Sequence, residues 1–277
     1  MMSDVRKAVR DRYSRAATDR GCGCGGSGTG TESSSCCGGG TETPVGQQST
    51  TFGYSIEELK ALPEGADLGL GCGNPTALAG LQPAEVVVDL GSGGGIDCFL
   101  AAARVGSSGR VIGVDMTPEM IERARANADA AGAANVEFRL GEIEHLPVAD
   151  DSADVIISNC VINLSPDKEQ VLAEAFRVLR SGGRLLVSDL VLDGALPPGL
   201  RENMALLTGC ISGALQKDEF VSALERAGFS DMRIERETGY LEGEQLGPLA
   251  ADAGISEADA ARIAERVRSV SMYARKD

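Results

Sequence analysis

Short apolar runs alternate with longer stretches of helical periodicity from residue 85 to the C-terminus. The short runs are typical of buried strands, and apolar residues that recur every three or four positions are typical of amphipathic helices. Strands that alternate with helices favour a mostly parallel sheet with helices on both faces. The pattern predicts seven strands, at residues 86–90, 110–114, 136–140, 154–158, 183–189, 232–238 and 267–274.

Capping residues set the limits of the predicted helices. Thr117 and Pro118 begin one helix and Gly132 ends it, because Thr caps helix N-termini, Pro suits the first helical position and Gly suits the C-terminus. Ser55 and Glu58 form a capping-box pattern for a short helix before Pro63. Further helices are expected at 96–105, 167–180 and 218–227.

The first 51 residues differ in composition from the rest of the chain. Residues 5–16 place apolar side chains at helical spacing among basic ones, which predicts a short amphipathic helix that needs a surface to dock on. Residues 21–51 are rich in Gly, Ser, Thr and Cys, with too few large apolar residues to form a core. We therefore expect a flexible, Cys/Gly-rich N-terminal arm within residues 1–51 and one α/β domain over residues 52–277.

Charge limits the classes of partner. The chain has 26 Lys and Arg against 41 Asp and Glu, a net charge of −15, so its surface repels nucleic acid and anionic lipid. No apolar run approaches the roughly 20 residues that a membrane span requires, and the charged N-terminus does not lead into a signal-peptide core. The sequence predicts a cytoplasmic protein without nucleic-acid or membrane partners.

A glycine-rich loop follows the first predicted strand. The dinucleotide pattern G-x-G-x-x-G fails in both registers, because Ile96 and Cys98 stand where the last glycine belongs. The loop instead carries Asp89, Gly91, Gly93 and Gly95. With these residues it resembles the first motif of class I S-adenosylmethionine-dependent methyltransferases, which implies a Rossmann-like fold and backbone contact with that cofactor.

Acidic residues follow the next two strands. Asp115 ends the second strand, where a carboxylate can accept hydrogen bonds from both ribose hydroxyls, and Met116 can pack on the adenine. Glu142, followed by Ile143, comes after the third strand, on the expected adenine side. Asp115 could instead cap a helix and Glu142 could be a surface charge. Three acidic strand ends together favour cofactor binding.

Eight cysteines and one histidine suggest thiol chemistry. Cys160 directly follows the fourth strand, Cys72 lies between two glycines in an expected tight, exposed turn, and Cys210 lies in the irregular segment 190–217. Cys98 lies inside an apolar helix and is expected in the core. A zinc site would use local Cys pairs, which these three thiols lack. Three dispersed thiols better suit a soft, three-coordinate, pyramidal centre.

Four segments together resemble the arsenite methyltransferase family: residues 65–77, 89–95, 114–120 and 157–167. The resemblance implies that Cys72, Cys160 and Cys210 bind trivalent arsenic, supplied as arsenite or its thiol conjugates, with 190–217 as an arsenic-binding segment. It also implies that Cys36 or Cys37 serves as disulfide partner during turnover, and that an external thiol reductant of the glutathione or thioredoxin type resets the enzyme.

Two other functions remain open at this stage. A class I methyltransferase acting on a quinone, amine or phenol would use the same cofactor motifs and leave the cysteines incidental. A non-catalytic metal- or metalloid-binding protein would use Cys22, Cys24, Cys36 and Cys37 for Cu(I) or Zn(II). The single histidine, His145, lies in a predicted loop and is given no catalytic role.

Overall fold

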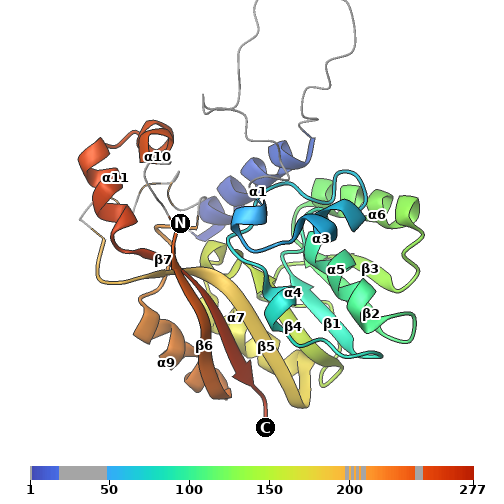
Figure 1. The fold of residues 1–277 in the computed structure, drawn as a ribbon. Coiled ribbons are helices and arrows are strands. Elements are labelled where there is room, and N and C mark those ends of the chain that lie inside the picture. The colour runs from blue at the N-terminus through green and yellow to red at the C-terminus, as the bar shows by residue number, and fades with distance from the viewer. Residues whose placement is uncertain are drawn as a thin grey trace, which may run out of the picture.

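A seven-stranded sheet forms the centre of the protein (Figure 1). The computed structural model describes residues 2–18, 49–196, 200, 203, 206, 210–240 and 246–277. The strand order is β3-β2-β1-β4-β5-β7-β6, in which β1 to β5 run parallel and β7 runs antiparallel to both of its neighbours. The strands are β1 (Val86–Leu90), β2 (Arg110–Asp115), β3 (Val136–Leu140), β4 (Ala153–Asn159), β5 (Leu179–Leu192), β6 (Ser230–Gly239) and β7 (Val267–Arg275).

The seven predicted strands and the α/β fold class are confirmed, with a difference at β5. The helix predicted to reach residue 180 ends at Val178, because Leu179 is already extended and pairs with Ala153. At its other end β5 continues to Leu192, opposite Val267 of β7. Pairing with β4 thus extends the strand before the predicted range 183–189, and the long antiparallel pairing with β7 extends it beyond that range.

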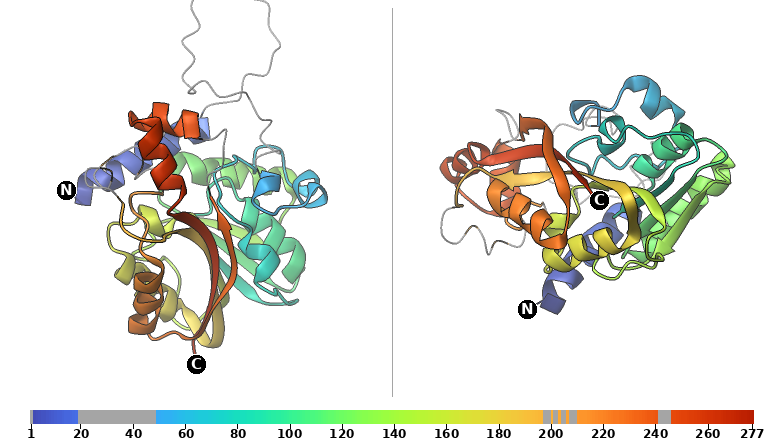
Figure 2. Two further views of the ribbon diagram at one scale, coloured as in Figure 1. Left: turned by 60° about the vertical axis from the view of Figure 1, so that its left-hand side comes forward. Right: turned by 90° about the horizontal axis from the view of Figure 1, so that it is seen from below.

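The helices cover both faces of the sheet (Figure 2). They are α1 (Met2–Thr18), α3 (Ile56–Ala61), α4 (Pro75–Leu78), α5 (Ile96–Val105), α6 (Pro118–Ala131), η1 (Ile162–Leu164), α7 (Lys168–Val178), α9 (Lys217–Ala227), α10 (Leu246–Ala253) and α11 (Glu257–Ala264). The Ser55 capping box and the left-handed Gly132 are present as predicted. Thr117 occupies the N-cap of α6, but its side chain makes no capping bond, which corrects the expected cap.

Alternating side chains of the strands enter two separate hydrophobic layers. Val87 packs in the layer with α5 and α6, whereas Val88 packs in the layer with α7 and α9. A third apolar cluster combines residues of α1, β5, α11 and β7 with Cys72, Cys160 and Cys210. This cluster lies around the C-terminal ends of β4 and β5 and positions the candidate site.

Helix α1 docks on the domain instead of standing apart from it (Figure 1). Ser14 Oγ donates to Glu119 Oε2 at 2.8 Å, and Arg123 Nη1 donates to the carbonyl of Ala17 at 2.8 Å. The surface that the predicted amphipathic helix needs is therefore α6. The predicted arm lies outside the described residues up to residue 48. Within the described ranges, no helix is long and apolar enough to cross a membrane.

Candidate active site

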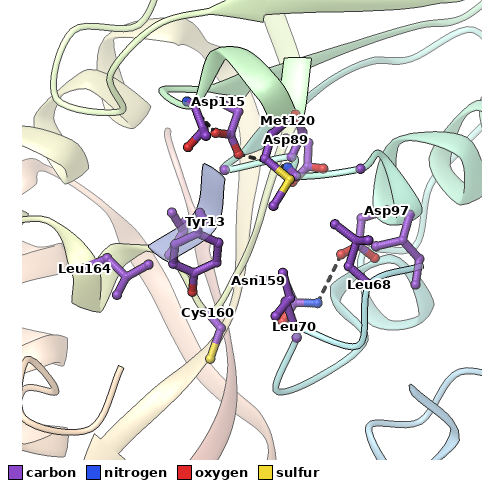
Figure 3. Close-up of a pocket in the computed structure, with 18 of the residues that line it drawn as sticks. Tyr13, Leu68, Leu70, Asp89, Asp97, Asp115, Met120, Asn159, Cys160 and Leu164 are labelled. Atoms are coloured by element: carbon purple, nitrogen blue, oxygen red, sulfur yellow. Dashed lines mark hydrogen bonds between the residues drawn. The ribbon is translucent and has the colours of Figure 1, made fainter. Parts of the chain in front are cut away.

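A cavity opens at the carboxyl ends of β1, β2 and β4, where ligands bind in open α/β sheets (Figure 3). Helix α1 contributes Arg6, Val9 and Tyr13 to its wall. The predicted site residues that line the cavity are Asp89, Gly91, Gly93, Asp115, Met116, Ile143 and Cys160. Gly95, Glu142, Cys72 and Cys210 do not line it.

Asp115 holds the glycine loop in place. Its Oδ2 accepts from the Gly93 N–H at 3.0 Å, and its Oδ1 accepts from the Thr117 N–H at 2.8 Å. Burial raises the pKa of this carboxyl, while hydrogen bonds from Thr117 and Gly93 oppose the rise. Gly93 has φ +51°, and a Cβ there would meet no atom within 4 Å, so the loop backbone faces open space.

The cavity walls fit a nucleoside-bearing cofactor. Asp115 offers carboxylate oxygens, Met116 and Ile143 offer apolar surface, and the loop offers bare backbone. Ser92 Oγ, which belongs to a lining residue, is buried without a hydrogen-bond partner among the described groups. An orphaned buried hydroxyl is costly unless a ligand or water satisfies it. The residues present therefore fit S-adenosylmethionine.

The acidic positions after β3 differ from the expected arrangement. Glu142 lies outside the cavity wall, with its carboxylate 3.8 Å from Arg6 Nε and 3.7 Å from Arg10 Nη2. Glu144 lines the cavity instead, accepting from Ser165 Oγ at 2.6 Å and Arg6 Nη2 at 3.3 Å. Helix α1 is thus tied to the loop on the expected adenine side.

A buried polar network, absent from the predicted site, joins three segments at the opposite end of the cavity. Tyr54 donates to Asp97 Oδ1 at 2.8 Å, and Asn159 Nδ2 lies 3.1 Å from Asp97 Oδ2 and 2.9 Å from the Tyr54 hydroxyl. Asn159 Oδ1 accepts from the Cys72 N–H at 3.1 Å. Burial raises the pKa of Asp97 to about 6. The one sequence signal was the position of Asn159 directly before Cys160.

Cys72 and Cys160 are joined by a disulfide, with Cα atoms 5.8 Å apart. Cys72 is buried, which corrects the expected exposed turn. Its flanking glycines permit close approach: a Cβ on Gly73 would lie 2.7 Å from Ser188 Cβ, and one on Gly71 would lie 2.9 Å from Asn159 Nδ2. The Gly-Cys-Gly sequence therefore lets this segment pass directly over β4 and β5.

Cys210 is a free, buried thiol beside this pair. Its Sγ donates to the carbonyl oxygen of Cys160 at 3.0 Å. Both residues adopt left-handed backbone angles, φ 57° for Cys160 and φ 65° for Cys210, which are uncommon away from glycine and concentrate at functional sites. The structure therefore brings the three predicted core thiols together. Cys22, Cys24, Cys36 and Cys37 lie outside the described residues.

Asp189 of β5 is a buried carboxylate next to the thiols. One of its oxygens and the sulfurs of Cys72 and Cys160 lie within 4.8 Å of one another. Asn163 Nδ2 and the Leu190 N–H each donate to Asp189 Oδ1 at 2.8 Å. Burial raises the pKa of Asp189 to about 7. Sequence analysis assigned this residue only to a strand end. Cys98, by contrast, is in the core as expected, donating to Asp89 Oδ2 at 3.2 Å.

The sheet order, the glycine loop and the acidic end of β2 define the class I methyltransferase fold. A methyltransferase domain family matches residues 81–228, more than half of the chain, and the chain belongs to this family. Within it, the chain is a member of the arsenite methyltransferase family, as the following similarities show.

Two curated relatives are arsenite methyltransferases. The one from Halobacterium salinarum is 48% identical over 232 residues, covering 83% of this chain and 59% of the relative. The one from Aquipseudomonas alcaligenes is 48% identical over 181 residues, covering 62% and 51%. The chain thus spans between half and three-fifths of the length of these relatives.

A solved structure agrees with this assignment. The arsenic (III) S-adenosylmethionine methyltransferase from Chlamydomonas reinhardtii is 35% identical, with a TM-score of 0.63, covering 86% of this chain and 75% of that chain. The YcgJ protein of Bacillus subtilis, at 20% identity and a TM-score of 0.57, shows the same fold.

Proposed function

We propose that this protein transfers methyl groups from S-adenosylmethionine to trivalent arsenic held by Cys72, Cys160 and Cys210. The observation that carries the proposal is the convergence of three cysteine residues from distant segments in one cluster beside the cofactor cavity. Cys160 lines the cavity and is joined to Cys72 by a disulfide. Its main-chain carbonyl accepts a hydrogen bond from the Cys210 thiol. The similarity to arsenic methyltransferases supports arsenic as the ligand of these cysteines.

The three thiols suit arsenic because thiolates are soft donors and trivalent arsenic is a soft centre. Each thiol replaces one oxygen ligand of arsenite, and its proton leaves with that oxygen as water, so no general base is needed. Three sulfurs leave one lone pair on arsenic, which points away from them. The buried setting of Cys72, Cys160 and Cys210 excludes water from this centre.

The residues of the cofactor cavity would position S-adenosylmethionine relative to the thiols. Asp115 would accept the ribose hydroxyls and the bare loop at Gly93 would admit the cofactor against the backbone. When bound, S-adenosylmethionine supplies an electrophilic methyl group on a sulfonium. Asn159 bonds to the Cys72 N–H and to Asp97 in the cavity wall, so it fixes the position of the Cys72 segment relative to the cofactor cavity.

Methyl transfer formally raises arsenic to the pentavalent state, and two electrons must return it to the trivalent state. We assign this reduction to two thiols that form a disulfide, with Cys36 or Cys37 as the N-terminal participant. An external reductant of the glutathione or thioredoxin type then regenerates the thiols. A cytoplasmic location would supply such a reductant. The Cys72–Cys160 disulfide must likewise be reduced before arsenic can bind.

Transfer of a labelled methyl group tests the proposal. Reduced protein is incubated with methyl-labelled S-adenosylmethionine and arsenite, and the products are separated by arsenic speciation. We expect label in methylated arsenic, loss of transfer in Cys210→Ser, and retention in the matched control Cys22→Ser with Cys24→Ser. Label transferred only to a quinone, amine or phenol would support the organic-acceptor function instead. Bound metal at stoichiometric amounts without any transfer would support a metal-binding protein.

A further inference from the structure

Cys72 lies in a segment that contains neither a helix nor a strand. Residues 69–73 have the sequence Gly-Leu-Gly-Cys-Gly and are irregular in the structure. Glycine restricts the backbone less than any other residue, so a cysteine between two glycines has many conformations open to it. The position of the Cys72 side chain therefore depends on contacts from outside this segment.

Side chains of two strands bind both main-chain polar groups of Cys72. Asn159 Oδ1, at the end of β4, accepts from the Cys72 N–H at 3.1 Å. Ser269 Oγ of β7 donates to the Cys72 carbonyl oxygen at 2.7 Å, across a sequence separation of 197 residues. The two hydrogen bonds restrain the peptide groups on either side of the Cys72 Cα, and hence the direction of its side chain.

Ser269 is a polar residue with apolar neighbours. It pairs with Leu190 of β5, and Val267 lies two positions earlier on the same face of β7. Leu190 and Val267 both belong to the apolar cluster that contains Cys72. A hydroxyl in such surroundings needs a hydrogen-bond partner, and the Cys72 carbonyl is the partner of this one. An apolar residue at position 269 would leave the Cys72 carbonyl without this donor.

The contact from Ser269 is specific to one of the three thiols. Cys160 directly follows β4, and Cys210 is hydrogen-bonded to the Cys160 carbonyl. Cys72 is held by the disulfide in the oxidised protein. Reduction removes that restraint, so the hydrogen bonds from Asn159 and Ser269 matter most in the form that would bind arsenic.

We propose that Ser269 is a positioning residue that holds Cys72 in place as a sulfur ligand of arsenic once the Cys72–Cys160 disulfide has been reduced. This inference rests on the proposed function. Ser269 acts through the main chain of Cys72 and does not contact the arsenic. It is also outside the lining of the cofactor cavity.

Removal of the hydroxyl tests the inference. In reduced protein, Ser269→Ala should weaken arsenite binding by about threefold to tenfold, the effect of one hydrogen bond. The affinity for S-adenosylmethionine should stay within about twofold of wild type, because Ser269 does not line the cofactor cavity. Ser269→Thr keeps the hydroxyl and should bind arsenite within about twofold of wild type. Titration calorimetry measures both affinities.

Ser271→Ala is the matched control. Ser271 lies on the same strand and the same face, but its hydroxyl is hydrogen-bonded to Ser188 Oγ at 3.0 Å instead of to Cys72. The control should leave arsenite affinity unchanged. An equal loss of affinity in Ser269→Ala and Ser271→Ala would show a general effect of β7 and overturn the inference.

A double-mutant cycle separates positioning of the Cys72 sulfur from other effects. Cys72→Ser removes the sulfur and keeps the main-chain carbonyl that Ser269 binds. Weak arsenite binding through Cys160 and Cys210 should remain in this variant, and adding Ser269→Ala should produce no further loss.

Two further outcomes would contradict the inference: an equal loss from Ser269→Ala with and without Cys72, or an unchanged arsenite affinity in Ser269→Ala. In either case arsenite binding by the wild-type protein leaves the proposed function standing. If the reduced wild-type protein binds S-adenosylmethionine and no arsenite, the proposed function itself fails and the inference fails with it.

Discussion

The Cys210 thiol donates a 3.0 Å hydrogen bond to the main-chain carbonyl of Cys160, although 50 residues separate the two in sequence. Cys160 follows β4, and Cys210 belongs to the segment after β5. The third sulfur, of Cys72, comes from the segment before β1 and is bonded to Cys160. The sulfur cluster therefore depends on three separate segments meeting at the end of the sheet.

We expect arsenite binding to require reduction of the Cys72–Cys160 disulfide. Thiolates bind the arsenic, and a disulfide removes two of the three donors. Protein treated with a phosphine reductant should hold one arsenic per chain after gel filtration, whereas oxidised protein should hold none. Elemental mass spectrometry measures the ratio. Equal arsenic content in the two forms would rule these two sulfurs out as ligands.

Asp115→Ala should weaken the affinity for S-adenosylmethionine by about 1.5–3 kcal/mol, the usual contribution of hydrogen bonds to a charged group. The carboxylate is the predicted ribose acceptor, and its loss also frees the Gly93 and Thr117 N–H groups that it holds. Asp115→Asn, which keeps one oxygen acceptor, should lose less. Calorimetry measures both variants, and an unchanged affinity in Asp115→Ala would disprove the ribose assignment.

Asn159→Ala should lower the free energy of unfolding by at least about 2 kcal/mol, because buried partners are left unsatisfied. The variant removes the acceptor of the Cys72 N–H and the donors to Tyr54, Asp97 and Gly73. Tyr54→Phe breaks part of the same network, so the two losses should not add in the double mutant. Urea unfolding with an unchanged slope gives these values. Strictly additive losses would show that the residues do not act as one network.

Sequence patterns identified the elements of the fold because their causes are local. Alternation, capping residues and glycines predicted the seven strands and the helices α1, α3, α5, α6, α7 and α9, whereas the helices α4, α10 and α11 were not predicted. The end of the helix before β5 was misplaced because pairing of Leu179 with Ala153, a contact between distant residues, decides it. Helix α1 was predicted, but its docking surface on α6 was not, since no local pattern specifies Ser14 against Glu119.

The candidate site was predictable only where local sequence motifs identify its residues. Motifs predicted Asp89 and Asp115 as cofactor-binding residues, and the cysteines were chosen because thiols are reactive and bind metals and metalloids. Asp189 acquires its importance from burial and from its place beside Cys72 and Cys160, which sequence spacing does not reveal. Glu142 was chosen by its position after β3, and spacing did not reveal that its carboxylate lies near Arg6 and Arg10 of α1.

Asp189 should make the stability of the protein depend on pH. Burial raises its pKa to about 7 in the folded state, above its ordinary value of 3.8. Its contribution is therefore fully present below about pH 4 and is lost as the pH rises through about 7. Asp189→Asn keeps an oxygen acceptor toward Asn163 and Leu190 and carries no charge.

The stability difference between Asp189→Asn and the wild-type protein should grow in favour of the variant between about pH 4 and pH 7, by up to about 1.4 kcal/mol per pH unit, and then stay constant. Urea unfolding of both oxidised proteins across this range measures it. A difference that is independent of pH would mean that Asp189 titrates at its ordinary value.

Coordination number distinguishes the roles of the three thiols. Arsenite can take three sulfur ligands, whereas monomethylated arsenic already uses one position for carbon and has two left. One thiol therefore becomes dispensable after the first methyl transfer. Cys160 lines the cofactor cavity and Cys210 is hydrogen-bonded to its main chain, while Cys72 comes from the segment before the sheet. Cys72 is the ligand we expect to be released.

Each thiol is replaced in turn by serine, and methylation of arsenite and of monomethylarsenite is measured by arsenic speciation under reducing conditions. Cys160→Ser and Cys210→Ser should abolish both reactions, because each removes one of the two sulfurs that remain on methylated arsenic. Cys72→Ser should lose the first reaction and retain much of the second. Loss of both reactions in Cys72→Ser would show that methylated arsenic still needs this sulfur. Full activity on arsenite without Cys160 or Cys210 would mean that arsenic is not held by three thiols.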